Sequence, residues 1–170
     1  MAAPNARSLN LDVELADEAA TAALGRTIAG RVACGDVIAL FGELGTGKSV
    51  FARAFINALP WPQGTPGDGP EEVPSPTFTL LQTYERDPAP IWHFDLYRLE
   101  RPEEVTELGL EEALAEAISL IEWPDRLGPR MPSDRLEVHL AFAESPQARR
   151  ATLIARGSWC ERLDGLAPHG

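Results

Sequence analysis

Hydrophobic positions in the N-terminal third of the chain alternate between strand-like and helix-like spacing. Residues 9–15 alternate as a strand does, and residues 17–32 repeat apolar side chains at helical spacing. Residues 37–41 form a continuous apolar run, as in a buried strand, and residues 48–59 place their apolar side chains on one helical stripe before Pro60. The order strand, helix, strand, helix favours a single α/β domain.

The remaining pattern predicts shorter elements joined by tight connections. It predicts, in order, strands over residues 78–85 and 91–98, helices over 102–108 and 110–118, and strands over 120–123, 135–142 and 149–156. The first and last pairs of these strands are close enough in sequence to form antiparallel hairpins. Residues 60–74 are rich in Pro, Gly and acidic residues, which predicts a mobile surface loop. We expect tails at residues 1–8 and 158–170.

A glycine-rich motif joins the apolar run at 37–41 to the helix that follows it. Residues 42–49 read Gly-Glu-Leu-Gly-Thr-Gly-Lys-Ser, a complete G-x-x-x-x-G-K-[ST] phosphate-binding loop. Glycines allow the backbone N–H groups to turn inward around an anion, and the helix N-terminus adds its positive dipole end. The residues expected to contact the nucleotide here are Glu43, Leu44, Gly45, Thr46, Gly47, Lys48, Ser49 and Val50.

Lys48 is the only lysine in the chain, since 14 of the 15 basic residues are arginines. A compact ammonium can reach the β- and γ-phosphates, and the planar fork of arginine does not replace it there. Ser49 offers a hydroxyl to Mg²⁺. The motif and its strand–loop–helix setting together predict a nucleotide site.

Composition narrows the classes of partner and compartment. The net charge of −11 argues against direct binding to a nucleic-acid backbone, so we expect any role with nucleic acid to be indirect. No apolar run has the length of a membrane span, and the N-terminus has no apolar segment of the secretory type. Cys34 and Cys160 lack metal-site spacing. These features predict a cytoplasmic protein.

Hydrolysis of a nucleotide also requires a carboxylate that orders Mg²⁺ and a group that places water. Within residues 91–98, Asp95 follows apolar residues on a predicted strand and is a candidate for metal or water contact, although a solvated strand face is the alternative. On the same strand, His93 is more typical of a structural histidine. Glu122 ends an apolar strand, where a carboxylate is well placed for Mg²⁺, and the alternative is an edge-strand glutamate in contact with water.

Two further segments contain candidate functional motifs. Residues 73–79 form a proline-stiffened stretch around Thr77, which fits either a γ-phosphate sensor or a plain entry into a strand. Residues 125–128 match the D-x-x-G pattern of GTPases. However, the guanine-reading motif of those proteins needs a lysine, and the chain has none besides Lys48. Adenine is therefore the favoured base.

Five segments together resemble one family, that of TsaE (YjeE). They are GELGTGKS at 42–49, SPTFT at 75–79, HFDLYRL at 93–99, ELG at 107–109 and IEWP at 121–124, and they occur in the order seen in that family. The resemblance extends over roughly residues 9–157. The first motif is common to many nucleotide-binding proteins, whereas the second, third and fifth together are specific.

This resemblance implies a P-loop NTPase-like α/β sandwich with a mixed parallel and antiparallel central sheet. It implies that ATP or ADP binds with Mg²⁺, that Lys48 contacts the phosphates, and that Ser49 and Glu122 hold the metal. Asp95 would serve a Walker-B-like role, also near the metal, and Thr77 would lie in a switch-like loop. Lys48, Asp95 and Glu122 are thus the expected catalytic residues.

The implied activity is ATP hydrolysis in support of TsaD and TsaB, which modify tRNA to threonylcarbamoyladenosine. Contact with tRNA would be only indirect, and turnover by the chain alone would be slow. The chain departs from the family at Ser49, where Thr is common, at Asp125, where Glu is common, and in a longer segment at 62–72. Two alternatives stay open: a small-molecule kinase of the nucleotide or shikimate type, and a nucleotide-binding module that does not hydrolyse.

Overall fold

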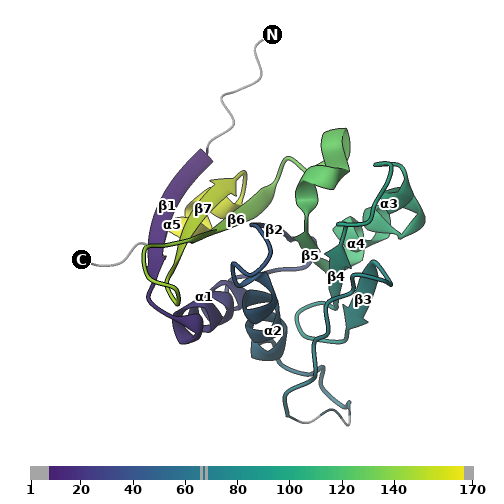
Figure 1. Cartoon of the computed structure of the whole chain (residues 1–170). Coiled ribbons are helices and arrows are strands. Elements are labelled where there is room, and N and C mark those ends of the chain that lie inside the picture. Colours follow the sequence, from purple (N-terminus) through teal and green to yellow (C-terminus); the bar gives the residue numbers. More distant parts are fainter. Residues whose placement is uncertain (1–7, 66, 68, 167–170) are drawn as a thin grey trace.

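In the computed structural model, which describes residues 8–65, 67 and 69–166, the strands form one seven-stranded sheet (Figure 1). The strands are β1 (Ser8–Leu15), β2 (Val37–Phe41), β3 (Leu81–Tyr84), β4 (Ile91–Asp95), β5 (Ile118–Glu122), β6 (Arg135–Phe142) and β7 (Arg149–Arg156). The helices are α1 (Glu18–Ala29), α2 (Lys48–Ala58), α3 (Glu104–Glu107), α4 (Leu110–Glu116) and α5 (Trp159–Asp164), with a 3₁₀ segment η1 (Pro124–Arg130). The α/β class predicted from the sequence is confirmed.

The sheet has a parallel centre and antiparallel margins. Its strand order is β1-β7-β6-β2-β5-β4-β3. Strand β2 pairs in parallel with β5 and β6, and β4 pairs in parallel with β5. The hairpins β3–β4 and β6–β7 are antiparallel, as predicted, and β1 pairs antiparallel with β7. The carboxyl ends of β2, β4 and β5 therefore meet at one edge of the sheet, where ligands of open α/β folds bind.

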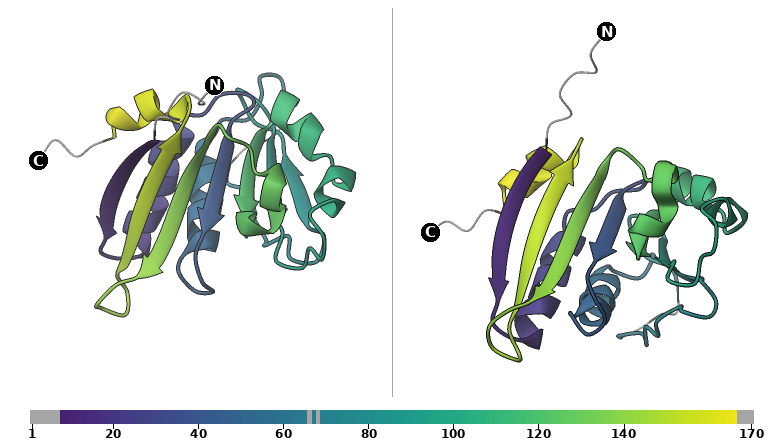
Figure 2. Two further views of the ribbon diagram at one scale, coloured as in Figure 1. Left: turned by 90° about the horizontal axis from the view of Figure 1, so that it is seen from above. Right: turned by 45° about the horizontal axis from the view of Figure 1, so that its top comes forward.

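Helices cover the two faces of the sheet unequally. α1 and α2 lie side by side on one face, and their apolar stripes pack on β2, β5, β6 and β7 around Phe51 and Phe55 (Figures 1 and 2). On the other face, α3, α4 and η1 cover the end of the sheet that holds β4 and β5. Because β4 and β5 are covered on both sides, polar residues within them are buried.

Several element boundaries differ from the sequence pattern. α1 ends at Ala29 rather than residue 32, and β3 begins at Leu81 rather than residue 78. Strand β4 ends at Asp95: the Leu96 N–H makes the last bond to β5, to the Glu122 carbonyl, and a turn at residues 97–98 follows. The predicted strand ends at residues 78 and 98 therefore lie outside regular strands, since hydrophobic alternation cannot show where pairing stops.

The predicted C-terminal tail is wrong for residues 159–164, and its residues 167–170 lie outside the described residues. Residues 159–164 form α5, and Trp159 and Leu163 are fully buried against the core formed by α1, α2 and the sheet. The Arg162 guanidinium stacks on the Trp159 ring at 3.9 Å and forms an ion pair with Asp36. Of the predicted N-terminal tail, residues 1–7 lie outside the described residues, and Ser8 belongs to β1.

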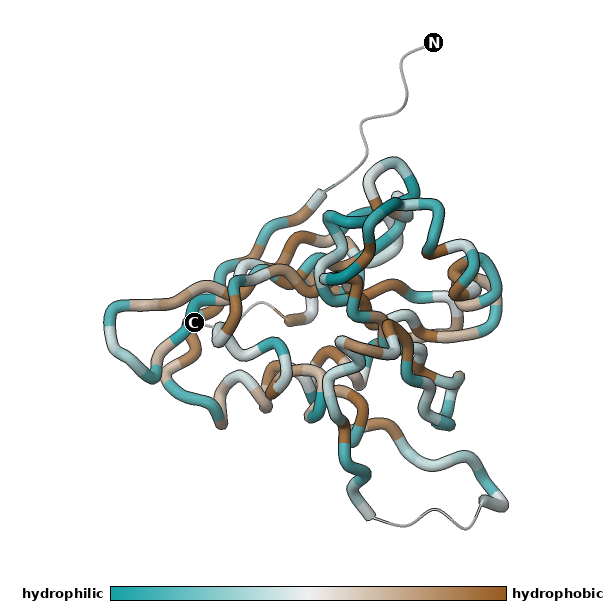
Figure 3. The backbone as a smooth tube through the Cα atoms, turned by 45° about the vertical axis from the view of Figure 1, so that its right-hand side comes forward, coloured by the Kyte–Doolittle hydropathy of each residue, from teal (hydrophilic) through white to brown (hydrophobic). Residues whose placement is uncertain are grey.

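The segment from 60 to 74 contains no helix or strand in its described residues, and it projects from the body as a largely hydrophilic loop (Figure 3). Its two ends are held to the body of the protein. The Glu71 N–H donates to the Asn57 side chain at 2.7 Å, and the Arg86 guanidinium lies 3.0 Å from Glu71 and 4.0 Å from the Trp61 ring. The mobility of this loop stays a prediction.

A buried carboxylate on β6 gives the sheet a pH-dependent contribution to its stability. Glu137 is 5% exposed and lies 2.8 Å from Arg156, 2.9 Å from Arg135 and 2.8 Å from the His139 ring nitrogen. Burial alone would raise the pKa of Glu137, but the hydrogen bonds from Arg156 and His139, with the charges of both arginines, outweigh it and lower the pKa. The unfolded chain therefore binds a proton at Glu137 more readily than the folded chain does.

We expect Glu137→Gln to destabilise the fold by about 3 kcal/mol at neutral pH, because it leaves Arg135 and Arg156 without their counter-charge. Stability of the wild type should fall as the pH drops below the usual glutamate range, and the variant should show a shallower fall. Urea unfolding between pH 7 and pH 3 measures both effects. Glu144→Gln, at an exposed position in the β6–β7 connection, is the matched control. Equal pH dependence in wild type and Glu137→Gln would contradict this account.

Candidate nucleotide site

The glycine-rich loop connects β2 to α2 in a conformation that only glycine adopts readily. Gly45 and Gly47 have φ angles of +84° and +107°. At Gly42, an added Cβ would lie 2.5 Å from the Thr46 hydroxyl oxygen and 2.8 Å from the Leu140 carbonyl oxygen, so a side chain cannot fit there. No side chain caps the N-terminus of α2. Its first N–H groups are therefore free of side-chain partners, which is the arrangement that binds phosphate.

Lys48 begins α2 and folds back into the loop. Its side chain is largely buried, its Nζ donates to the Gly42 carbonyl at 2.5 Å, and it lies 3.7 Å from the centre of the Trp123 ring. Burial lowers the pKa of Lys48, while the nearby Glu122 and Asp95 carboxylates partly oppose that shift. The ammonium is thus held at the centre of the loop, beside two carboxylates.

Asp95 and Glu122 are neighbours at the carboxyl edge of the sheet. They end β4 and β5 and face each other in the strand register, and each is only 4% exposed. The solvated strand face considered as an alternative for Asp95 is therefore wrong. Sequence alternation alone could not distinguish the two, because it does not reveal that β4 is covered on both faces.

The two carboxylates differ in how much of their hydrogen-bonding capacity is already used. Asp95 accepts from the Ser75 and Thr77 hydroxyls at 3.0 and 3.1 Å through one oxygen, and from the Tyr97 N–H at 3.1 Å through the other. Asp95 thereby holds Thr77 and its loop at the site. Glu122 has one oxygen 2.8 Å from the His93 ring, and its other oxygen accepts no hydrogen bond from the described residues. Glu122 is the carboxylate with a free oxygen.

A cavity of about 360 Å³ brings most of the predicted residues together. Its lining includes Leu44, Gly45, Gly47, Lys48, Ser49, Val50, Thr77, Asp95 and Glu122, with Ser75, Tyr97 and Trp123 added by the structure. Glu43 and Thr46 are not among the lining residues. Instead, the Thr46 hydroxyl donates to the Glu43 carbonyl at 2.7 Å, so these two residues shape the loop.

The donor set in this cavity fits Mg²⁺ only together with a phosphate ligand. Ser49 and Glu122 both line this cavity and offer hard oxygen donors. No cluster of three or more His, Cys, Asp or Glu side chains among the described residues could hold a metal by itself. This agrees with the usual behaviour of Mg²⁺, which takes one or two protein oxygens and completes its shell with phosphates and water.

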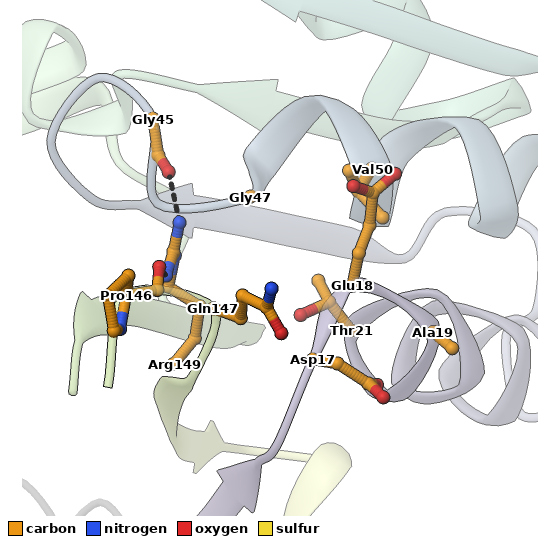
Figure 4. Close-up of a pocket in the computed structure, with 10 residues that line it drawn as sticks. All are labelled: Asp17, Glu18, Ala19, Thr21, Gly45, Gly47, Val50, Pro146, Gln147 and Arg149. Carbon is orange, nitrogen blue, oxygen red and sulfur yellow. Dashed lines mark hydrogen bonds between the residues drawn. The ribbon is translucent and has the colours of Figure 1, made fainter. Parts of the chain in front are cut away.

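A second cavity, of about 470 Å³, adjoins the other side of the glycine-rich loop (Figure 4). It is formed by the start of α1, by Gly45, Gly47 and Val50, and by the β6–β7 connection, from which Gln147 extends toward α1. The Arg149 guanidinium donates to the Gly45 carbonyl at 3.1 Å and so ties this connection to the loop. Because both cavities share Gly45, Gly47 and Val50, they lie side by side along the phosphate-binding loop.

Sequence reasoning missed the second cavity. Its lining consists of Asp17, Glu18, Ala19, Thr21, Gly45, Gly47, Val50, Pro146, Gln147 and Arg149. Three segments that are far apart in the chain contribute to it, and none carries a recognisable motif apart from the glycine-rich loop. The one local feature of the sequence in this region was the adjacent pair Arg149–Arg150, which by itself does not indicate a binding site.

Across the part of the chain that the structure describes, no helix combines the length and apolar character needed to span a membrane.

Comparisons with known proteins agree with the arrangement of these residues. A family model described as "Threonylcarbamoyl adenosine biosynthesis protein TsaE" matches residues 15–151. A Rickettsia bellii protein named "tRNA threonylcarbamoyladenosine biosynthesis protein TsaE" is 39% identical over 136 residues, which cover 80% of this chain and 90% of the relative. A Bacillus subtilis protein of the same name is 32% identical over 84% of each chain. The crystal structure of Bacillus subtilis YdiB aligns with a TM-score of 0.74 and 26% identity over 94% of this chain and 97% of that one. The chain therefore belongs to the TsaE family.

Proposed function

We propose that this chain binds ATP with Mg²⁺ and hydrolyses it in support of threonylcarbamoyladenosine synthesis on tRNA. The observation that carries the proposal is the cavity that Lys48, Ser49 and Glu122 line at the uncapped N-terminus of α2. A cation, a hydroxyl, a carboxylate and backbone N–H donors converge there, and a nucleoside triphosphate with its metal needs that combination. The tRNA-modifying context comes from the family and from the names of the relatives.

Each group in the phosphate cavity has a distinct role in this proposal. Lys48 exchanges its bond to the Gly42 carbonyl for the phosphates, and Ser49 and Glu122 hold Mg²⁺. When bound, the metal neutralises charge on the phosphate oxygens. Asp95 positions Thr77 beside the cavity, and a direct contact of Asp95 with the metal would require it to release Ser75 or Thr77.

The second cavity is suited to the base and sugar of the nucleotide. It adjoins the phosphate loop, and its walls combine apolar groups such as Ala19 and Val50 with the Gln147 amide. Ligand sites commonly have this mixture of apolar walls and a few oriented polar groups. A nucleotide can therefore place its base against α1 and its phosphates over the start of α2.

Filling the base cavity should weaken ADP binding without affecting the phosphate site. We expect Ala19→Trp to reduce ADP affinity about tenfold, because the indole would occupy space that the base needs. Inorganic tripolyphosphate should bind the variant as it binds the wild type. Ala23→Trp, at an exposed position one turn further along α1, is the control. Calorimetric titration measures all three, and equal ADP affinity in Ala19→Trp and Ala23→Trp would place the base elsewhere.

We further propose that TsaD and TsaB complete the active unit and that tRNA is reached only through them. The cavity that holds Lys48 has no arginine in its lining, so this chain supplies no second cation near the phosphates from that lining. Slow hydrolysis by the chain alone follows from this. Leu44 and Phe78 are 75% and 80% exposed, and both lie on loops at the phosphate end of the site. They offer apolar surface to a partner. A cytoplasmic location is consistent with such partners and stays a prediction.

The direct test of the proposal is nucleotide binding measured by calorimetry. ATP or ADP with Mg²⁺ should bind the purified chain, and GTP should bind more weakly. Removal of Mg²⁺ with a chelator should reduce the affinity for ATP. Absence of binding for all of these nucleotides would refute the proposed function.

A further inference from the structure

His93 lies directly behind Glu122, and we propose that it is a positioning residue that orients the Glu122 carboxylate toward Mg²⁺. This inference rests on the proposed function, because it assigns a role within the same metal site. The sequence pattern by itself is more typical of a structural histidine at this position. In the structure, the His93 ring makes a polar contact with Glu122, and no other polar contact of the ring is found among the described residues.

The contact between His93 and Glu122 is a short hydrogen bond between two buried side chains. His93 Nε2 lies 2.8 Å from Glu122 Oε2, and the side chains of the two residues are 2% and 5% exposed. His93 is on β4 and Glu122 on β5, and both point to the face of the sheet that packs on α2. A carboxylate that binds a metal is ionised and only accepts hydrogen bonds, so the Nε2 nitrogen is the donor.

The bond fixes one oxygen of Glu122 and leaves the other for the metal. Oε2 accepts from His93, whereas no described residue donates to Oε1, and Glu122 lines the same cavity as Lys48 and Ser49. The histidine itself does not line that cavity. It therefore acts on the metal through the glutamate and does not compete for the metal as a ligand.

An ordinary structural role for His93 predicts a different set of contacts. A core histidine held for packing usually has both ring nitrogens satisfied, since a buried polar atom without a partner is unfavourable. In this structure, His93 Nδ1 is buried and has no hydrogen-bond partner among the described residues. A leucine of similar size would fill the same space. The feature that a histidine adds at this position is therefore its hydrogen bond to Glu122.

Residues that orient metal ligands typically change metal affinity tenfold to 100-fold when they are removed. We expect His93→Leu to raise the Mg²⁺ concentration needed for half-maximal enhancement of nucleotide binding by about that factor. Binding of ADP in the presence of a chelator should stay as in the wild type, because Lys48 and the loop N–H groups are untouched. His93→Gln should restore most of the Mg²⁺ response, because its amide can still donate to Glu122.

The experiment is calorimetric titration of ADP at a series of Mg²⁺ concentrations, in the wild type, His93→Leu and His93→Gln. The same substitution is then made in a Glu122→Ala background as a double-mutant cycle. If His93 acts through Glu122, His93→Leu has no further effect there. An unchanged Mg²⁺ response in His93→Leu overturns the inference, and so does an equal loss in the Glu122→Ala background or a loss of chelator-resistant ADP binding.

If His93→Leu does not fold, the pair His93→Gln and His93→Asn decides the question. The asparagine side chain is shorter and cannot span to Glu122, so its Mg²⁺ response should fall while that of the glutamine variant is retained. Equal Mg²⁺ responses would overturn the inference. Failure of the proposed function is distinct from all of these results, because the wild type itself would then bind no ADP.

Discussion

Replacing Lys48 with alanine will weaken ADP binding about 100-fold, which corresponds to roughly 2.7 kcal/mol, the usual size of a hydrogen bond to a charged group. Lys48 is the only lysine of the chain, and its ammonium lies at the centre of the phosphate-binding loop. No arginine lines the cavity around it, so no neighbour within that lining can take over the charge. Calorimetric titration of ADP into wild type and variant measures the loss.

Two further substitutions separate the charge of Lys48 from its volume. Lys48→Met keeps an unbranched side chain that can pack on the Trp123 ring, so it should bind ADP as weakly as the alanine variant. Lys48→Arg keeps the charge, but the planar guanidinium does not fit where Nζ approaches the Gly42 carbonyl at 2.5 Å, and binding should also fall. Thermal unfolding of each variant shows whether the fold is intact. Wild-type ADP affinity in Lys48→Met would contradict the assignment of the phosphate site.

Glu122→Gln will leave nucleotide binding in the presence of a chelator intact and will reduce Mg²⁺-dependent ATP hydrolysis about 100-fold. The glutamine amide fills the same space beside His93, but it lacks the charge that a hard divalent cation requires. A bound metal supplies several kcal/mol of charge stabilisation to phosphoryl transfer, and about 3 kcal/mol corresponds to the expected factor. Phosphate release from ATP measures the rate.

Asp125→Asn is the matched control for this substitution. Asp125 is exposed, lies three residues beyond Glu122 and does not line the phosphate cavity, so its variant should hydrolyse ATP as the wild type does. Asp95→Asn should have an intermediate effect, because Asp95 acts on Thr77 and Ser75. Full activity in Glu122→Gln, or equal losses in Glu122→Gln and Asp125→Asn, would show that the metal is held elsewhere.

The phosphate half of the site could be predicted because its chemistry is local in sequence. Gly42, Gly47, Lys48 and Ser49 belong to one short sequence motif, and the positive φ angles that its loop needs are a property of glycine itself. Asp95 and Glu122 could be proposed one at a time, since each follows an apolar run at the end of a predicted strand. That they are neighbours depends on the parallel pairing of β4 with β5, which the pattern does not specify.

The features that escaped prediction depend on contacts between distant segments. The base cavity needs α1 and the β6–β7 connection to meet at the glycine-rich loop, and Arg149 reaches Gly45 across more than a hundred residues of sequence. The α5 helix is too short for its periodicity to stand out, although Trp159 is fully buried. The sequence favours a structural role for His93, because its contact with Glu122 joins two strands whose pairing the pattern does not specify.

The most direct test of the central claim is ATP hydrolysis by the purified chain with Mg²⁺, measured alone and with TsaD and TsaB added. The account predicts slow phosphate release by the chain alone, a higher rate with the pair, and only background release for Lys48→Ala in both conditions. No Mg²⁺-dependent release with or without the pair would contradict it. Transfer of phosphate to a small acceptor instead of water would also contradict it and would favour a kinase.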